Sequence, residues 1–326
     1  MLNQVTYFER LLALHPSKFE MAKRLTSILS ISSDAVYRRI RGDTALTTDE
    51  LFELQRHFHV NLTDSASAGM FEFNFAEREI KSPGDYVDQL EARMAMVKEL
   101  TGLRLLIANP GLPFFHEMIW PRLFAFKLYI YGSTVWNFSG WQDLKFKPEV
   151  IDQKVLDRAF AIGEYSYTVP GIELWTLGIL HATLDQIEFM HLAGKFADDE
   201  QADLLLRELS SLVDHLAEMS STGRKFVPGA DPEQGALFSP AHNELANNDN
   251  VVVIESDQAT TLFATFITPN FLQTVNPTVV GLTQKWFHGI DALSTPLGAT
   301  AGRQRGWYFK RLRKQLKDVR NRIENE

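Results

Sequence analysis

The chain has 326 residues, of which 45% are hydrophobic and 23% are charged, a composition that indicates a folded globular protein and excludes a disordered or collagen-like one. It contains no cysteine, which excludes disulfide scaffolds, thiolate metal sites and cysteine nucleophiles. The first residues show no basic segment followed by an apolar run, and no apolar stretch reaches the roughly 20 residues of a membrane span. We therefore expect a cytoplasmic protein without membrane contact, long enough for two domains.

The net charge of −8 is unevenly distributed along the chain. Residues 1–64 hold 8 basic and 8 acidic residues, whereas residues 303–326 hold 9 basic and 3 acidic residues. The segment between them holds 16 basic and 30 acidic residues, which gives it a net charge of −14. Because an acidic surface repels nucleic acid, any nucleic-acid contact is expected from the two ends of the chain.

The first thirty residues predict two helices. Apolar residues at helical spacing favour a helix over residues 3–14. Ser17 and Glu20, three residues apart, form a capping box that opens a second helix to about Leu29. Phe19 is expected to be buried by this second helix.

A third short helix is predicted after a tight turn at residues 30–32. Ser32 can cap a helix from Ser33 to Arg41 by accepting a hydrogen bond from its first turn. Gly42 ends that helix, because glycine adopts the left-handed conformation without a clash at Cβ.

A fourth helix completes the amino-terminal group. Thr47 and Glu50 form another capping box, which opens a helix to about Phe58 with Leu54 facing inward. Residues 1–64 are therefore expected to form a helix-turn-helix domain of four to five helices.

One face of the third helix carries side chains that can bind DNA. Helical spacing places Asp34, Tyr37, Arg38 and Arg41 on this face, with Arg39 at its border. A short polar helix after a tight turn can enter the major groove of double-stranded DNA, where arginine forms two hydrogen bonds with guanine. The predicted DNA contacts are Ser32, Ser33, Asp34, Tyr37, Arg38, Arg39 and Arg41.

The segment from Leu25 to Asp43 resembles the Cro/CI (XRE) type of helix-turn-helix. It is most similar to a branch of bacterial regulators with the signature Tyr-Arg-Arg-Ile/Leu-Arg-Gly after the turn, which residues 37–42 match. Two positions depart from the family pattern: Ser30 stands where a turn glycine is commonest, and Thr26 stands where a small alanine is usual. The resemblance implies a transcription factor.

A homodimer is expected, because one such module buries little surface and two-fold proteins contact half-sites about 34 Å apart. The alternative function is a protein-interaction module that uses a degenerate helix-turn-helix as a docking surface and does not bind DNA. The two functions differ in their response to salt, because neutralising phosphates makes the logarithm of affinity fall linearly with the logarithm of salt concentration.

Residues 70–326 predict a larger helical domain, so the chain is expected to be mainly α with a small β insert. A short strand is expected over residues 70–75 after a linker at 65–69, and a strand pair at 250–254 and 260–268 forms the insert. The expected helices cover residues 83–100, 147–165, 171–192 and 198–222. From residue 269 onward the chain is again expected to be helical, and it ends in a basic helix at 307–323.

Segments of this region also resemble the long carboxy-terminal domain of the same regulators, a domain for which the resemblance implies no particular ligand. These segments are Leu112–Phe115, Pro121–Lys127, Val169–Trp175, Gln186–Phe189 and Arg303–Leu312. Ten of the 28 residues from 114 to 141 are aromatic, which suits a cavity for an apolar or aromatic effector but also a solid core. The candidate effector contacts are Trp120, Tyr129, Trp136 and Trp175, with Glu173 and His181 as polar partners.

No residue pattern argues for an enzyme, a cofactor or a metal. His181, Asp185, Glu188 and His191 share one helical face, but a carboxylate-bridged metal site needs a second Glu-x-x-His helix, which the chain lacks. No nucleophile or phosphate-loop signature occurs.

The basic terminal helix could contact phosphates, or it could lie against the acidic body of its own domain or of a partner subunit. Its basic residues are Arg311, Arg313, Lys314, Lys317 and Arg320. The sequence favours self-association or a solvated face.

Overall fold

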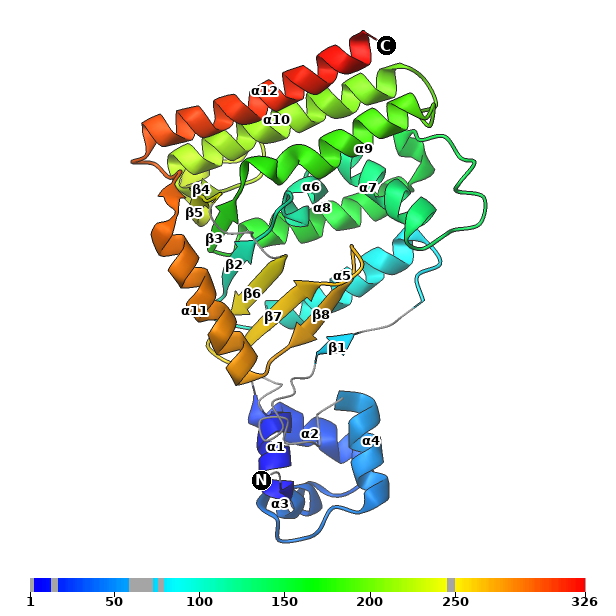
Figure 1. Ribbon diagram of the computed structural model, residues 1–326. Coiled ribbons are helices and arrows are strands. Elements are labelled where there is room, and N and C mark those ends of the chain that lie inside the picture. Colours follow the sequence, from blue (N-terminus) through cyan, green and yellow to red (C-terminus); the bar gives the residue numbers. More distant parts are fainter. Residues whose placement is uncertain (1–2, 13–16, 59–72, 76–78, 245–249, 326) are drawn as a thin grey trace.

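The computed structural model describes residues 3–12, 17–58, 73–75, 79–244 and 250–325 (Figure 1). It opens with four helices: α1 Gln4–Leu12, α2 Lys18–Leu29, α3 Ser33–Arg41 and α4 Thr48–Phe58. The predicted caps are confirmed, since the hydroxyl of Ser17 accepts from the N–H of Glu20 and that of Ser32 accepts from the N–H of Ala35. The expected linker at 65–69 lies outside the described residues.

These four helices share a hydrophobic core of their own, to which each of them contributes. Phe19 is 67% exposed, so the prediction that it is buried was wrong: it lies in the first turn of α2 on the side away from the core. The buried members of this core are Tyr7, Phe8, Leu11, Met21, Ala22, Leu25, Val36 and Leu54.

The rest of the chain is a mixed α/β structure, which corrects the expectation of a mainly α fold with a small β insert. In the part of the chain that the structure describes, nine strands form one sheet in the order β1-β8-β7-β6-β2-β3-β5-β4, with β9 beside β5. The strands are β1 Asn74–Phe75, β2 Arg104–Ala108, β3 Gly171–Trp175, β4 Arg224–Lys225, β5 Ala236–His242, β6 Val251–Glu255, β7 Thr260–Thr265, β8 Phe271–Thr274 and β9 Thr295–Pro296.

The centre of the sheet is parallel and its flanks are antiparallel. β2, β3 and β5 run parallel, with Leu106 opposite Ile172 and Ile172 opposite Ser239. β6 pairs antiparallel with β2 and with β7, which confirms the predicted strand pair. Parallel neighbours need long crossover connections, and here these connections are the helices that cover the sheet.

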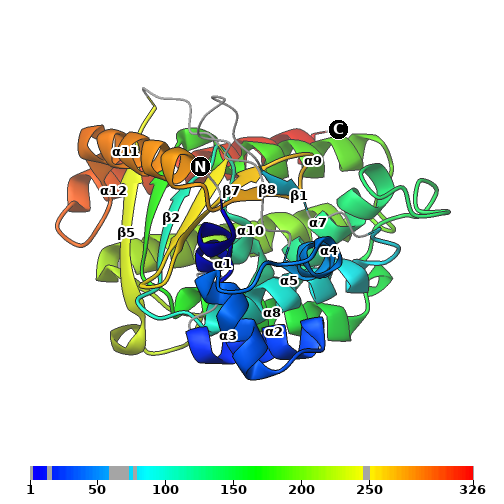
Figure 2. The same ribbon diagram turned by 90° about the horizontal axis from the view of Figure 1, so that it is seen from below.

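Helices lie on both faces of the sheet. They are α5 Pro83–Lys98, α6 Phe114–Met118, α7 Pro121–Thr134, α8 Gln153–Tyr167, α9 His181–Leu192, α10 Glu200–Thr222, α11 Pro277–Leu293 and α12 Gly302–Glu324. Figure 2 shows α11 on one side of the sheet and α5 and α8 on the other.

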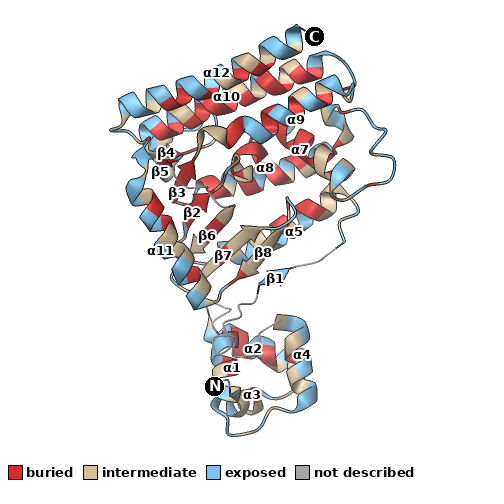
Figure 3. Ribbon diagram, in the orientation of Figure 1, coloured by how far each residue is buried: buried red, intermediate tan, exposed pale blue. Residues whose placement is uncertain are grey.

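Side-chain alternation along β2 explains these two layers. Leu106 and Ala108 pack with Phe287 of α11, whereas Leu105 and Ile107 pack with residues of the opposite layer. The largest core lies farther out, among α7, α9, α10 and α12, where the buried residues concentrate (Figure 3).

The segment 171–192, expected to be one helix, is divided between β3 and α9. All five residues of β3 are buried, because the strand is central in the sheet and covered on both faces. A short apolar run of this kind has no period that separates a buried strand from a helix.

None of the helices in the described ranges is both long enough and apolar enough to span a bilayer.

Candidate nucleic-acid interface

The predicted DNA-contact face of α3 is exposed to solvent. The side chains of Asp34, Arg38 and Arg41 are 76%, 51% and 57% exposed, and Tyr37 is 36% exposed. Ser32 and Ser33 are exposed at the amino-terminal end of the same helix. Val36 on the opposite face is buried in the core of α1–α4. The helix therefore presents one continuous polar face.

The cations on this face form only exposed ion pairs. Arg38 lies 3.0 Å from Asp34, and Arg41 lies 2.8 Å from Asp43. Exposed pairs of this kind contribute about 0–1 kcal/mol, so a phosphate or a base edge can replace the carboxylate at low cost.

Arg39 differs from these residues, because its side chain is only 14% exposed. Its guanidinium forms two contacts with the Glu50 carboxylate, 3.0 Å from Nε and 2.7 Å from Nη2, and Nη1 donates to the carbonyl of Ala35. The structure thus places Arg39 between α3 and α4, where it joins the two helices, and not on the exposed face.

Glu50 has a second set of partners in the capping box of α4. Its carboxylate accepts from the N–H of Thr47, and its own N–H donates to the Thr47 hydroxyl. Burial alone would raise the pKa of the Glu50 carboxyl, but its hydrogen bonds with Arg39 and Thr47 hold that pKa below its usual value. The start of α4 and the middle of α3 are therefore fixed by one carboxylate.

The side-chain amide of Gln4 fixes the end of α3 from the other side. Its Nε2 donates to the carbonyls of Arg39 and Thr44, at 2.8 and 2.7 Å, and its Oε1 accepts from the N–H of Leu46 at 2.8 Å. Three of its hydrogen-bonding positions are thus used on α3 and on the loop that leads to α4. The sequence analysis did not identify Gln4, since its partners are about forty residues away.

The turn between α2 and α3 adopts the conformation that the family glycine normally provides. Ser30 has φ of +52°, in the left-handed region, so serine occupies this position at some cost in strain. Gly42 has φ of +82° at the end of α3, and a Cβ there would lie 3.1 Å from a methyl group of Val5. Both ends of α3 are therefore fixed by backbone geometry.

The aromatic residues proposed as effector contacts belong to the hydrophobic core. Trp175 and Tyr129 are 0% and 2% exposed, and Trp120 and Trp136 pack partly buried against the same core. None of the four lines either of the two cavities described for the structure. This placement favours the alternative in which these rings are solid core.

A network of buried polar groups was not predicted. His116 lies between two partners, the Tyr167 hydroxyl at 2.7 Å from Nδ1 and the Glu173 carboxylate at 2.9 Å from Nε2. The indole N–H of Trp175 donates to the same carboxylate. The ammonium group of Lys225, also buried, donates to the carbonyl of Ser166.

Charge and burial act against each other in this network. Burial opposes ionisation of Glu173, but His116 and Lys225 outweigh it and hold the pKa of the carboxyl below its usual value. Burial lowers the pKa of Lys225 to about 8, although Glu173 acts in the opposite direction. No cavity described for the structure reaches Glu173 or Lys225, so we assign the network to the core.

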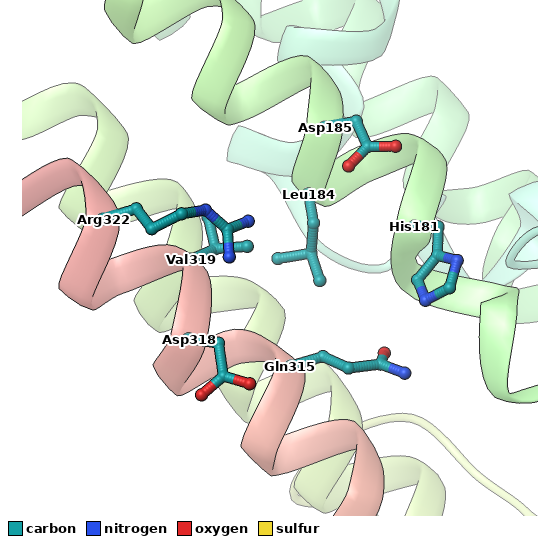
Figure 4. A pocket seen from close by; sticks show the side chains of 7 residues that line it. All are labelled: His181, Leu184, Asp185, Gln315, Asp318, Val319 and Arg322. Carbon is teal, nitrogen blue, oxygen red and sulfur yellow. The ribbon is translucent and has the colours of Figure 1, made fainter.

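A cavity of about 250 Å³ lies between α9 and α12 (Figure 4). Its lining residues are His181, Leu184, Asp185, Gln315, Asp318, Val319 and Arg322. Glu188 is bound at both carboxylate oxygens by Arg322, so it is not free to bind a metal with His191. Within the described ranges, no group of three or more His, Asp or Glu side chains is arranged to hold a metal ion.

Comparisons with known proteins do not identify a relative. No family model matches the chain, and neither a curated protein nor a solved structure is similar enough to indicate kinship. The resemblance to Cro/CI-type regulators remains a prediction from the residues of the chain.

Proposed function

We propose that this protein binds double-stranded DNA sequence-specifically through the exposed face of α3 and regulates transcription. The observation that carries the proposal is the polar face of α3, with Asp34, Tyr37, Arg38 and Arg41 exposed together on a helix that follows a tight turn. Arginine on such a helix can form two hydrogen bonds with guanine in the major groove.

The contacts that hold α3 in place are compatible with DNA binding. Arg39 and Glu50 hold the middle of the helix, and Gln4 holds its end, without using the exposed side chains. A binding surface built on a rigid element loses less conformational entropy when it binds. Arg39 is therefore a positioning residue in this proposal, whereas Arg38 and Arg41 contact DNA.

Selection of genomic fragments with the full-length protein tests the proposal, and enrichment of a common sequence is the expected result. Arg38→Ala should weaken binding to the enriched site by about 1–3 kcal/mol, or roughly 5- to 150-fold, because it removes a base contact. Fluorescence anisotropy with the enriched duplex measures this loss. Arg56→Ala, an exposed arginine on α4, is the matched control and should change affinity little. A selection that enriches no sequence would contradict the proposal.

We further propose that the protein acts as a homodimer. Two copies of α3 can contact two half-sites on one duplex, which a single copy cannot do. The outer side of α11 offers an apolar surface for this association, with Leu282 60% and Leu293 76% exposed. Sedimentation at micromolar concentration should show a species of twice the 37.1 kDa chain mass, and a monomer alone would contradict this part.

One observation favours the second candidate function, a protein-interaction module. Phe19 and Phe52 are 67% and 55% exposed on α2 and α4, and exposed aromatic side chains suit protein contacts. If this function holds, Phe52→Ser should abolish partner capture while α3 variants leave it unchanged. DNA binding with a steep salt dependence would argue against it.

A further inference from the structure

The carboxy-terminal helix α12 has two very different faces. Its inner face belongs to the largest core. The buried residues of this face are Tyr308, Phe309, Leu312, Leu316 and Val319. Its outer face is cationic: Arg303, Lys310, Lys314 and Lys317 project together at helical spacing, with Arg311 beside them, and all five are exposed. We call these five residues the α12 cationic row. It extends over about 21 Å of helix, at 1.5 Å per residue.

The cations of α12 fall into two groups. Those at the flanks pair with acidic residues of neighbouring helices, as Arg313 does with Asp214 and Arg322 with Glu188. In the α12 cationic row, only Lys314 has an ion pair among the described residues, with Asp318 one turn along the same helix. Asp214 of α10 and Glu188 of α9 thus pair with the flanks, and the row is exposed.

The charge of the surrounding region makes this row unusual. Residues 303–326 hold 9 basic and 3 acidic residues, next to a segment with 16 basic and 30 acidic residues. A rigid, linear set of cations on an acidic protein matches a linear polyanion. Double-stranded DNA carries one negative charge per about 1.7 Å of its axis.

A lipid surface fits this helix less well. Helices that lie in a membrane interface insert an apolar face between the lipids. The apolar face of α12 is buried inside the protein, and Trp307 is the large apolar side chain that the helix exposes, at 50%. Phosphates of nucleic acid need only the cations.

We propose that the α12 cationic row is a second DNA-contact surface, which binds the phosphate backbone of double-stranded DNA without reading its sequence. This proposal does not depend on sequence recognition by α3. Figure 1 shows α12 at the end of the molecule opposite to α3, so the duplex on the row is a different segment from the one on α3. A single chain can then bridge two segments of DNA.

Neutralisation of the row in the full-length protein tests the proposal. The variant Lys310→Gln, Arg311→Gln, Lys317→Gln removes three cations at exposed positions of α12. The matched control, Lys145→Gln, Lys147→Gln, Lys154→Gln, makes the same change of net charge at exposed lysines elsewhere in the same region. Binding to a 20-base-pair duplex of random sequence is measured by anisotropy from 50 to 200 mM salt.

We expect the row variant to lose at least 10-fold in affinity at 100 mM salt, while the control keeps the affinity of the unmodified protein. The slope of log affinity against log salt should fall by about 2 to 3 for the row variant, since each lost phosphate contact contributes about 0.9. Equal affinities and slopes for the two variants would overturn the proposal. So would row-dependent binding to phosphatidylserine vesicles without any effect on DNA.

The same experiment separates this proposal from the function proposed for α3. Arg38→Ala combined with Arg41→Ala should remove preference for an enriched site but leave binding to the random duplex that depends on the row. If no sequence is enriched and the row variant still loses affinity for the random duplex, sequence recognition fails and the second surface stands.

Discussion

The helices α1–α4 and the sheet region, here residues 73–75, 79–244 and 250–325, stabilise their polar groups in different ways. In α1–α4 the central ion pair, Arg39 with Glu50, keeps 14% and 15% of its side chains exposed and shares its carboxylate with a helix cap. In the sheet region, Glu173 and Lys225 are each 2% exposed; Glu173 bonds with His116, and Lys225 donates to the carbonyl of Ser166. The first arrangement fixes one helix, whereas the second places charges in a core where an unpaired charge is very costly.

This difference predicts where the protein is sensitive to substitution. Loss of the partly solvated Arg39–Glu50 pair should destabilise α3 locally and leave the sheet intact. Loss of a buried partner such as Glu173 should destabilise the whole sheet region. All six tryptophans lie between residues 120 and 307, so tryptophan fluorescence follows unfolding of the sheet region alone. The predictions below use this separation.

The largest effect is expected for Glu173→Gln. It leaves Lys225 and His116 without their buried carboxylate and should lower the free energy of unfolding of the sheet region by about 3–5 kcal/mol. Urea unfolding followed by tryptophan fluorescence measures the loss. Glu164→Gln, at an exposed position of α8, is the control and should cost little. Equal midpoints for the two variants would show that the network adds no net stability.

A pH effect of about 2–3 kcal/mol is expected from Lys225. Its pKa is about 8 in the folded protein and 10.5 when unperturbed, so between these values the unfolded chain binds more protons. The contribution of Lys225 to the free energy of unfolding therefore rises with pH from about 8 upward, and below pH 8 it is constant. The unmodified protein should gain stability relative to Lys225→Met between pH 7.5 and pH 10.

The measurement for Lys225 is urea unfolding at several pH values, again by tryptophan fluorescence. Lys154→Met, at an exposed lysine, should show a pH profile parallel to that of the unmodified protein. If the profile of Lys225→Met is also parallel, the ammonium group is not desolvated in the folded state.

A smaller and local effect is expected for Glu50→Gln. Glutamine can still accept the hydrogen bond of the capping box, so the change removes the ion pair with Arg39. We expect a loss of about 2 kcal/mol, less than for a fully buried pair because both side chains are partly solvated. Hydrogen exchange of the α3 amides should accelerate about 30-fold, with no change in tryptophan-detected unfolding. Glu53→Gln, whose pair with Arg56 is exposed, should leave exchange unchanged.

The smallest effect, a gain in stability, is expected for Ser30→Gly. The left-handed backbone of Ser30 is strained for serine, whereas glycine adopts it freely but loses more entropy on folding. The net gain should be about 0.5 kcal/mol, seen as slower exchange of α2 and α3 amides. Ser27→Gly, in the interior of α2, should have the opposite sign. A destabilised Ser30→Gly would show that the serine side chain contributes more than the strain costs.

The structure of α1–α4 could be predicted from the sequence because the patterns that define its helices are local. Ser17, Ser32 and the Thr47–Glu50 pair each act within three residues, and Gly42 ends α3 by its own conformation. The exposed face of α3 followed from helical spacing. The role of Arg39 did not: its position at the border of that face favoured a phosphate contact, whereas its side chain pairs with Glu50 of α4.

The sequence predicted only part of the sheet region. The antiparallel pair β6 and β7 was found, because its two β-branched strands are close in sequence. β2, β3 and β5 were missed, since each is a short segment whose partner lies some 60 to 150 residues away. The same holds for His116, Glu173 and Lys225, which come together only when those strands pair.

By itself, therefore, the sequence determined the helices of residues 3–58, their caps, the exposed polar face of α3 and the basic character of α12. Only the tertiary structure decided that Arg39 is turned toward Glu50, that the aromatic residues from Trp120 to Trp175 form core, and that the α12 cationic row faces solvent. The physical reason is the separation along the chain over which each interaction acts. Caps and helical spacing act within one or two turns, whereas burial and ion pairing depend on partners that the chain brings close only after the strands have paired.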